Sequence, residues 1–326
     1  MKEALFYKTE GEDTLLCTLC PQNCQLQEGQ KGFCGVRQVK EGKLYSLNYG
    51  EVSSVAMDPV EKKPLYHFYP GTQVFSLGTR GCNFKCPYCQ NWSLSQKNPE
   101  VQKYSPREVV TMALNKNCSA LAYTYSEPLV WYEFVKDTAE LAAEEGLKNI
   151  LVTNGFINTQ PLTELLPLID AANVDLKAGS ADFYRQYCRG ERQPVLETIT
   201  TMAAEIHLEL TTLVITDLND DPEEMQGLFD WIADINPDIP LHLSRYFPRY
   251  QLKKKATSLT KMQNLYQLAT DRLNYVYLGN TGLADYNNTA CQQCAANLIT
   301  RSYYQVESSL EEGCCPHCGQ EMMGEF

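Results

Sequence analysis

The stretch Gly81-Cys82-Asn83-Phe84-Lys85-Cys86-Pro87-Tyr88-Cys89-Gln90-Asn91 follows the apolar run Val74 to Leu77 and carries three cysteines spaced C-x3-C-x2-C. Cysteine thiolates are the usual protein ligands of iron–sulfur clusters, and a four-iron cluster normally takes four of them. This stretch offers three, so one iron would stay open to a ligand from outside the protein. Structural zinc fits less well, because it needs a closed set of four ligands and no fourth Cys or His lies nearby in the sequence. The stretch therefore predicts a four-iron cluster with one open position.

Composition limits the partners and the compartment of this protein. The 326 residues include 28 Lys and Arg against 40 Asp and Glu, which gives a formal net charge of −12. A chain this acidic, with basic residues gathered only at Lys253 to Lys255, argues against nucleic acid as the main partner. The sequence has no apolar run of about 18 residues and no signal-peptide core at its start. We therefore expect a cytoplasmic protein that binds neither nucleic acid nor membrane.

The fourteen cysteines are grouped at metal-ligand spacings, whereas disulfides are rare in the reducing cytoplasm. Four of them form the N-terminal pattern C-x2-C-x3-C-x9-C, namely Cys17, Cys20, Cys24 and Cys34. Short Cys-rich segments usually need a metal to fold. This set therefore predicts a metal site, with zinc and a second iron–sulfur cluster as the two alternatives. Cys118 and Cys188 are interpreted as core thiols, and Cys314 has no assigned role.

A second pair of C-x2-C knuckles lies near the C-terminus. The first knuckle is Cys291 with Cys294, and the second, twenty residues further on, is Cys315 with Cys318. The intervening run Leu298 to Val306 is typical of a short strand. Paired knuckles at this distance predict a zinc ribbon, in which the metal stabilises a segment too small to fold alone.

From residue 71 onward, short apolar segments alternate with segments of helical periodicity. Helices are expected after the caps Ser105 and Asp221, around Pro161, and over Leu129 to Glu145, where Gly146 would end the helix. The expected strands are Val74 to Leu77, Ala120 to Thr124, Asn149 to Thr153, Asn173 to Leu176, His207 to Ile215, Leu241 to Ser244 and Tyr275 to Leu278. Strands this apolar predict a parallel sheet covered by helices, either doubly wound or closed as a barrel.

With the aromatic Tyr88 before its third cysteine, the stretch at Cys82, Cys86 and Cys89 resembles the signature of the radical SAM superfamily. The resemblance implies a [4Fe-4S] cluster whose open iron chelates S-adenosylmethionine and, once reduced, cleaves it to a 5'-deoxyadenosyl radical that abstracts hydrogen from a substrate. Of the doubly wound sheet and the barrel, the resemblance favours the barrel. It implies an α/β fold with a partial (β/α)6, TIM-like barrel whose site lies at the carboxyl ends of the strands.

The same resemblance implies residues that bind the cofactor. The segment Thr124-Tyr125-Ser126-Glu127-Pro128 occupies the place of a Gly-Gly-Glu-Pro motif that binds the amino group of S-adenosylmethionine, with Tyr and Ser where Gly is usual. Glu127 would pair with the ammonium group. Asn154 would lie near the ribose or the methionine end, and Leu213, Val214 and Ile215 would form an apolar shelf under adenine.

Four further residues at strand ends are candidates for catalysis. A buried lysine is costly unless it is paired, so Asp175 and Lys177, spaced Asp-x-Lys, predict a functional pair. The segments Thr153-Asn154-Gly155 and Asp175-Leu176-Lys177 both resemble motifs of the pyruvate formate-lyase activating enzymes, which implies that Asp175 and Lys177 lie near the cofactor or the substrate. His242 and Arg245 are second-tier candidates, and Arg245 would hold a carboxylate.

Over nearly its whole length the chain resembles the radical SAM enzymes of the AmmeMemoRadiSam system. The likeness rests on the N-terminal Cys pattern, the segment Asp58 to Gly71, the Cys-Pro-Tyr-Cys-Gln-Asn-Trp run and the terminal ribbon. It implies Memo-like and AMMECR-type proteins as partners, together with an electron donor such as flavodoxin or ferredoxin. We expect a Cys-rich module with a lead-in at 1–70, the barrel at 71–284 and a zinc-ribbon tail at 285–326.

Three hypotheses on function follow. The first is an oxidoreductase that starts radical chemistry on a small molecule or a partner protein. The second is a glycyl-radical-enzyme activating enzyme, which abstracts hydrogen from a glycine of another protein. The third is an iron–sulfur protein that only carries electrons or binds a partner. The open iron position, Glu127 and Lys177 argue against this third hypothesis.

Overall fold

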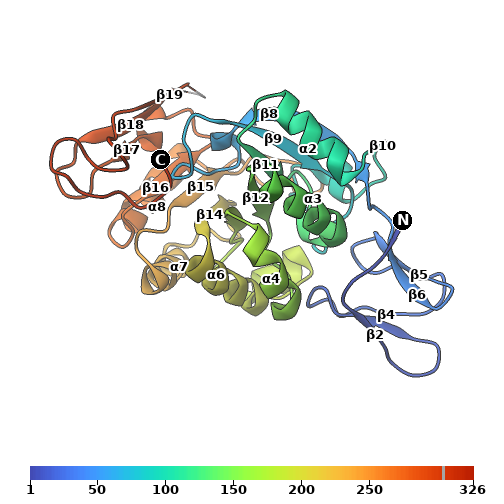
Figure 1. Ribbon diagram of the computed structural model, residues 1–326. Helices are drawn as coiled ribbons and strands as arrows, with labels where there is room; N and C mark the ends of the chain where they lie inside the picture. Colours follow the sequence, from blue (N-terminus) through green and yellow to red (C-terminus); the bar gives the residue numbers. More distant parts are fainter. Residues whose placement is uncertain (303–304) are drawn as a thin grey trace.

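The centre of the molecule is one eight-stranded sheet (Figure 1). The computed structural model describes residues 1–302 and 305–326. In spatial order the strands are β16 (Val276–Gly279), β15 (Leu241–Arg245), β14 (His207–Val214), β13 (Ala171–Asp175), β12 (Lys148–Thr153), β11 (Ala120–Tyr123), β9 (Gln73–Gly78) and β8 (Ser54–Pro59). The strands from β9 to β16 run parallel, and β8 runs antiparallel to β9. Because β8 and β16 are the two edges, the sheet is open, and we call this curved sheet with its outer helices the barrel.

The seven predicted strands are confirmed. Together they give one parallel strand more than the six of the expected (β/α)6 barrel. The structure adds β8, which was not predicted. This strand ends in the sequence Asp58-Pro59, which is typical of a loop, and proline is tolerated there because β8 is an edge strand.

Helices follow the parallel strands and form the outer layer of the sheet (Figure 1). The main ones are α2 (Pro106–Asn115), α3 (Tyr132–Glu144), α4 (Thr159–Leu165), α6 (Gln193–Glu205), α7 (Pro222–Ile235) and α8 (Leu259–Thr270). The predicted caps are present: the Ser105 side chain accepts from Glu108 N, and Asp221 accepts from two amides of α7. The helix expected over Leu129 to Glu145 begins instead with a 3-10 turn, Pro128–Trp131, before α3.

The inner face of the sheet is filled by the segment that follows β8 rather than by helices. Val60, Leu65 and Phe68 from this segment pack against small inner side chains of the sheet, such as Ala120 and Ala171. These small residues leave room for the segment inside the curved sheet. As a result, the space at the carboxyl ends of the strands is bounded by the sheet on one side and by residues 61–66 on the other.

Two small Cys-rich units flank the sheet on different sides (Figure 1). The N-terminal unit contains a three-stranded sheet of β2 (Tyr7–Thr9), β3 (Leu15–Cys17) and β4 (Gln25–Leu26). A second three-stranded sheet joins β1 (Lys2–Glu3), β6 (Lys43–Ser46) and β5 (Arg37–Lys40). A buried ion pair between Arg37 and Glu133 of α3 fixes this unit to the barrel.

The C-terminal unit is a sheet of β17 (Thr289–Ala290), β18 (Asn297–Ser302) and β19 (Gln305–Ser308). The predicted run Leu298 to Val306 thus spans two antiparallel strands, and its residues 303 and 304 lie outside the described residues. Arg301 donates to the Tyr66 carbonyl at 2.6 Å, and Glu325 N donates to the His67 carbonyl at 2.8 Å. The tail is therefore packed against the segment that fills the barrel. No helix in the described ranges is long and apolar enough to cross a membrane.

Candidate active site

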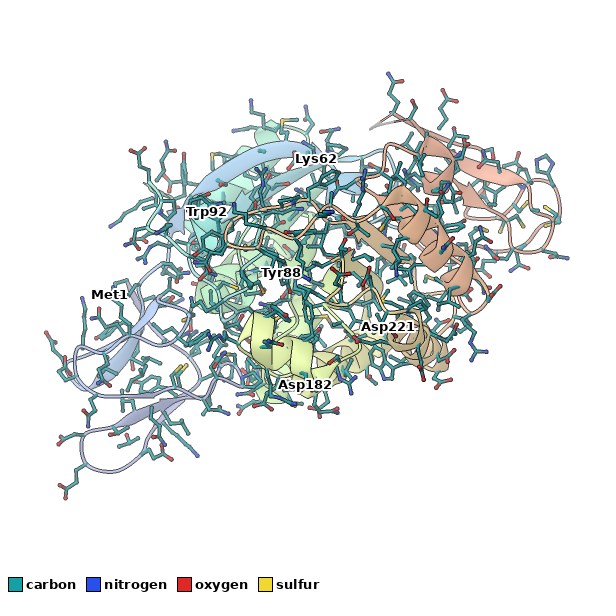
Figure 2. The ribbon with its side chains drawn as sticks, turned by 180° about the vertical axis from the view of Figure 1, so that it is seen from behind. Met1, Lys62, Tyr88, Trp92, Asp182 and Asp221 are labelled. Atoms are coloured by element: carbon teal, nitrogen blue, oxygen red, sulfur yellow. The ribbon has the colours of Figure 1, made fainter. Side chains whose placement is uncertain are left out.

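A cavity of about 500 Å³ opens at the carboxyl ends of the parallel strands. Parallel strands end at one edge of the sheet, so residues from distant parts of the chain meet there. Eleven of the residues predicted from the sequence line this cavity: Cys82, Cys86, Tyr88, Cys89, Ser126, Glu127, Asn154, Asp175, Lys177, Leu213 and His242. In Figure 2, Tyr88 lies near the middle of the molecule and Lys62, which also lines the cavity, lies above it.

The three loop thiols face this cavity and receive polar contacts from the surrounding backbone and side chains. Phe84 N donates to Cys82 Sγ at 3.3 Å, and Asn154 Nδ2 lies 3.7 Å from the same sulfur. Cys89 Sγ lies 3.3 Å from Ser95 Oγ. Hydrogen bonds to the sulfurs tune the potential of a thiolate-bound cluster, so this loop is suited to hold one.

Cys188, interpreted from the sequence as an isolated core thiol, lies against the loop of residues 81–91 that carries the three thiols, which we call the cluster loop. The Tyr88 hydroxyl is 3.3 Å from Cys188 Sγ, and the Cys188 carbonyl accepts from Lys85 N at 2.8 Å. This thiol supports the loop from behind, since it is completely buried and does not line the cavity. Because Cys188 and Tyr88 are a hundred residues apart in the chain, no local pattern in the sequence indicates this contact.

Glu127 is held rigidly at the cavity wall. Oε1 accepts from Thr153 Oγ1 at 2.6 Å and from Leu129 N at 3.0 Å, and Oε2 accepts from Asn154 N at 2.8 Å. Burial raises the pKa of Glu127 to about 7, even though these hydrogen bonds act to lower it. A nearby cation would favour its charged form, so the carboxyl group is prepared to bind an ammonium group.

Ser126 provides a test of whether a polar ligand fits here. Its Oγ is buried and has no hydrogen-bond partner among the described residues, although the residue lines the cavity. A buried hydroxyl without a partner costs about 1–3 kcal/mol. The preceding Tyr125 has φ of +67°, a rare conformation for a bulky residue, and its hydroxyl donates to Asp58 at 2.5 Å. The unpaired Ser126 hydroxyl lies beside Glu127, and the three loop thiols line the same cavity. Together these groups fit a zwitterionic ligand bound to a cluster.

Asp175 and Lys177 form the ion pair that the Asp-x-Lys spacing predicted. Lys177 Nζ lies 2.6 Å from Asp175 Oδ2. Burial would lower the pKa of Lys177, but the Asp175 carboxylate outweighs burial and raises this pKa above its ordinary value. Lys177 therefore stays charged in the cavity, where it can fix an anionic group or donate a hydrogen bond.

Glu209 is a central residue that the sequence analysis missed. It is completely buried below the cavity, and its Oε1 accepts from the backbone amides of Tyr66 and His67, each at 2.7 Å. Its Oε2 lies 2.6 Å from His242 Nε2. Burial would raise the pKa of Glu209, but hydrogen bonds from His207 and His242 outweigh it and hold the pKa below its ordinary value. The signal available in the sequence was Glu209 itself, a polar residue at an inward-facing position of the largely buried strand β14.

Of the predicted residues, Val214, Arg245 and Thr124 lie outside the cavity lining. Val214 packs in the core under the helices, and the adjacent Leu213 faces the cavity, because successive side chains of a strand point to opposite faces. Arg245 donates from Nε to the Thr257 carbonyl at 2.6 Å and lies over the Phe247 ring. Thr124 is buried at the end of β11, where its amide donates to the Leu77 carbonyl.

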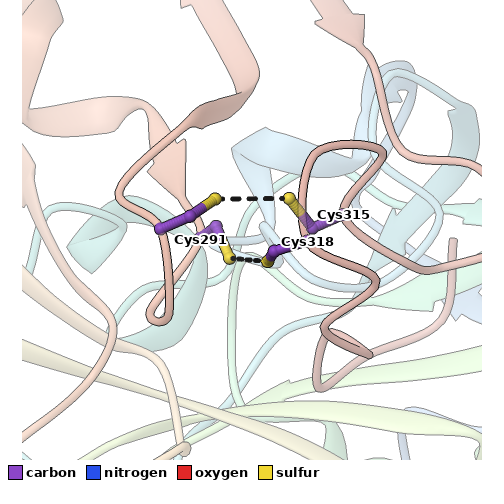
Figure 3. A group of neighbouring side chains, drawn as sticks. Cys291, Cys315 and Cys318 are labelled. Atoms are coloured by element: carbon purple, nitrogen blue, oxygen red, sulfur yellow. Dashed lines mark hydrogen bonds between the residues drawn. The ribbon is translucent and has the colours of Figure 1, made fainter.

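The tail knuckles converge as their spacing predicted. The sulfur atoms of Cys291, Cys294, Cys315 and Cys318 all lie within 4.8 Å of one another. Cys291 Sγ is 3.5 Å from Cys318 Sγ, and Cys294 Sγ is 3.6 Å from Cys315 Sγ (Figure 3). Four sulfurs this close can surround one metal ion tetrahedrally. Cys314 stays outside the group.

Comparisons with known proteins point to one superfamily. Residues 76–232 match the family model of the Radical SAM superfamily. A Methanocaldococcus jannaschii protein described as uncharacterized is 40% identical over 332 residues, which cover 99% of this chain and 99% of the relative. The pyruvate formate-lyase 1-activating enzyme of Escherichia coli is 26% identical over 164 residues, which cover 48% of this chain and 67% of that enzyme.

A solved structure agrees at the level of the fold. The crystal structure of a radical SAM methyltransferase from Sphaerobacter thermophilus matches with a TM-score of 0.50 and 14% sequence identity. The match covers 65% of this chain and 67% of the methyltransferase.

Proposed function

Because the chain belongs to the radical SAM superfamily, we propose that it is an enzyme that uses a [4Fe-4S] cluster and S-adenosylmethionine to start radical chemistry on a small molecule or a partner protein. The observation that carries this proposal is the shared cavity: three loop thiols, the unpaired Ser126 hydroxyl and the Glu127 carboxyl group all line it. When bound, the cluster and cofactor supply reductive cleavage to a 5'-deoxyadenosyl radical that abstracts hydrogen.

In this proposal, the chain's own residues bind the cluster and orient the cofactor. Cys82, Cys86 and Cys89 would hold the cluster, and Glu127 would accept hydrogen bonds from the cofactor's ammonium group. The Ser126 hydroxyl offers a further hydrogen bond to the cofactor. Asn154, whose amide group also contacts Cys82 and Asn83, would orient the cofactor beside the loop.

The opposite side of the cavity would receive the substrate. Lys177, held charged by Asp175, can fix an anionic or carbonyl group of a substrate. His242 is fixed through Nε2 by Glu209, which leaves its Nδ1 edge to contact a substrate. Of the three residues predicted as the apolar shelf, Leu213 on β14 lines the cavity and would take this role, whereas Val214 and Ile215 do not line it.

A second candidate is a glycyl-radical-enzyme activating enzyme. The 26% identity to a pyruvate formate-lyase activating enzyme favours it, and the open sheet would admit a peptide loop. The unpaired Ser126 hydroxyl and the Glu127 carboxyl group argue against the third candidate, a protein that only carries electrons, because electron transfer alone needs neither group in the cavity.

The partners and the tail metal are part of this proposal. Memo-like and AMMECR-type proteins would act with the enzyme, and a low-potential carrier such as flavodoxin or ferredoxin would supply electrons. The four tail thiols would hold zinc, because their sulfur spacing suits a single tetrahedral ion.

An anaerobic assay tests the proposal. The protein is reconstituted with iron and sulfide, reduced and mixed with S-adenosylmethionine, and 5'-deoxyadenosine is quantified. We expect deoxyadenosine to form slowly without substrate and faster with it. No deoxyadenosine from a protein that carries its full iron content would overturn the proposed function and favour the electron carrier.

A further inference from the structure

The N-terminal cysteines form a second thiol site that the catalytic cavity does not use. Cys17, Cys20, Cys24 and Cys34 surround a small enclosed cavity between the N-terminal sheets and the barrel. Two turns bring them together: Cys17 N donates to the Cys24 carbonyl at 2.9 Å, and Asn23 N donates to the Cys20 carbonyl at 3.0 Å. Cys34 lies in a further turn, in which Gly35 N donates to the Gly32 carbonyl at 2.8 Å, and all four cysteines line the same cavity.

Two hydrogen-bond donors indicate that this cavity suits a negatively charged group. Phe33 N donates to Cys24 Sγ at 3.3 Å. Arg37 lines the cavity and is 1% exposed, yet its Nε has no hydrogen-bond partner in the described part of the chain. The two terminal nitrogens of Arg37 are already used by the Leu5 carbonyl and Glu133. A buried donor without a partner is costly, and an anionic metal–thiolate group in the cavity would satisfy it.

The spacing of the sulfurs separates this site from the tail site. Within the part of the chain that the structure describes, the tail cysteines form the one group of three or more potential ligands whose atoms lie within 4.8 Å of one another. Neither the four N-terminal thiols nor the three loop thiols form such a group. In this respect the N-terminal site resembles the loop site and differs from the tail, and a four-iron cluster, being larger than a single ion, does not need its thiolates in one such tight group.

The N-terminal site also lies directly behind the cluster loop. A Cβ atom on Gly81 would be 2.9 Å from the Cys34 carbonyl oxygen, so only glycine fits where this loop crosses the module. Gln22, two residues after Cys20, donates to the Asn83 carbonyl at 3.0 Å. Gly81 and Asn83 are the two neighbours of Cys82. The second thiol site is therefore in direct backbone contact with the cluster loop.

We propose that Cys17, Cys20, Cys24 and Cys34 hold a second iron–sulfur cluster that passes single electrons to the cluster at Cys82, Cys86 and Cys89. An external low-potential one-electron carrier is oxidised by one electron as the N-terminal cluster is reduced. The N-terminal cluster is then re-oxidised as the loop cluster gains that electron. This inference rests on the proposed function for its acceptor, but the cluster itself can be tested without S-adenosylmethionine.

The first test uses a protein in which Cys82, Cys86 and Cys89 are all replaced by Ala. It is reconstituted anaerobically with iron and sulfide, analysed for iron, sulfide and zinc, and examined by electron paramagnetic resonance after reduction with dithionite. We expect about four irons per chain and the signal of a reduced cluster. Adding Cys20→Ser should remove both, whereas Cys118→Ser, a buried thiol outside all three groups, should leave both unchanged.

Zinc without iron at this site, or iron that persists after Cys20→Ser, would overturn the proposal. The Cys20→Ser dependence also excludes iron bound adventitiously by the tail thiols. Because no step uses S-adenosylmethionine, failure of this test leaves the proposed function standing, and failure of the deoxyadenosine assay leaves this test standing.

The second test concerns electron transfer in a protein with the loop thiols intact. Reduced flavodoxin is mixed with the wild-type protein and with Cys20→Ser, and the reduced loop cluster is followed by freeze-quench electron paramagnetic resonance. We expect the variant to lose fast reduction by flavodoxin but to remain reducible by dithionite, which is small enough to enter the cavity. Equal rates with flavodoxin in both proteins would overturn the relay.

Discussion

Glu209 and His242 lie on the neighbouring strands β14 and β15 and are joined by a hydrogen bond of 2.6 Å between Oε2 and Nε2. His242 lines the cavity, whereas Glu209 is completely buried beneath it. The same carboxylate holds the amides of Tyr66 and His67, which belong to the segment that fills the barrel. One buried group therefore fixes both a cavity residue and the opposite wall.

Glu209→Gln should destabilise the protein. The amide nitrogen of Gln would face a donor that now bonds to a carboxylate oxygen, which costs about 1–3 kcal/mol in the free energy of unfolding near neutral pH. Urea denaturation under anaerobic conditions measures the loss. Glu12→Gln, at an exposed loop position, is the matched control and should leave the denaturation midpoint unchanged.

The difference in the free energy of unfolding between the wild type and Glu209→Gln should become smaller at acidic pH. The pKa of Glu209 is below its ordinary value in the folded state, and the ordinary value of about 4.3 applies when the chain is unfolded. The stability from this shift is complete above that pH and is lost as the pH falls toward the folded-state pKa. A difference that stays constant down to about pH 3 would contradict an ionised Glu209.

Cys86→Ser should abolish cleavage of S-adenosylmethionine and leave the barrel folded, because Cys86 lies in a loop after β9 and not in a strand. The assays are deoxyadenosine formation and far-ultraviolet circular dichroism. Cys118→Ser removes a buried thiol that does not line the cavity and should retain cleavage. Deoxyadenosine from the Cys86 variant would contradict the assignment of the cluster loop.

Binding of S-adenosylmethionine should weaken as the pH falls through about 7, because the pKa of Glu127 is raised to about 7 and its protonated form cannot pair with an ammonium group. Glu127→Gln should bind about tenfold or more weakly above that pH, since a charge-assisted hydrogen bond is worth ~1.5–3 kcal/mol. Anaerobic calorimetric titration of the reconstituted protein measures both effects.

The control for this prediction is Glu144→Gln, at an exposed position near the end of α3. Its affinity and pH dependence should match those of the wild type. The Glu127 variant should show no transition near pH 7, and a transition that persists there would mean that another group titrates.

Cys318→Ser should release the tail metal and loosen the tail more than it slows cleavage. The four sulfurs form one closed group, and small metal-bound units lose their fold when a ligand is removed. Zinc content, circular dichroism and deoxyadenosine formation, measured together, test this. Cys314→Ser changes a neighbouring thiol outside the group and should retain zinc. Loss of cleavage as complete as in Cys86→Ser would contradict a purely structural tail.

Local patterns in the sequence were sufficient to predict the strands and helices and to identify the loop that carries Cys82, Cys86 and Cys89. Apolar runs of strand length, capping residues such as Ser105 and Asp221, and the C-x3-C-x2-C spacing are set by neighbours in the chain, and the structure has the strands and caps at those positions. Strand β8 was missed because Asp58-Pro59 has the composition of a loop. Only its pairing with β9 at the sheet edge makes this segment a strand.

Contacts between distant segments were decided by the tertiary structure alone. Strand alternation placed Leu213, and not Val214, at the cavity, and the curved sheet brought Cys188 against Tyr88 and Glu209 against His242. The sequence by itself determined which residue types could bind a cluster, a cofactor ammonium and a tail metal. Which of them share a cavity depends on strand order and register, and those are set by packing across the whole chain.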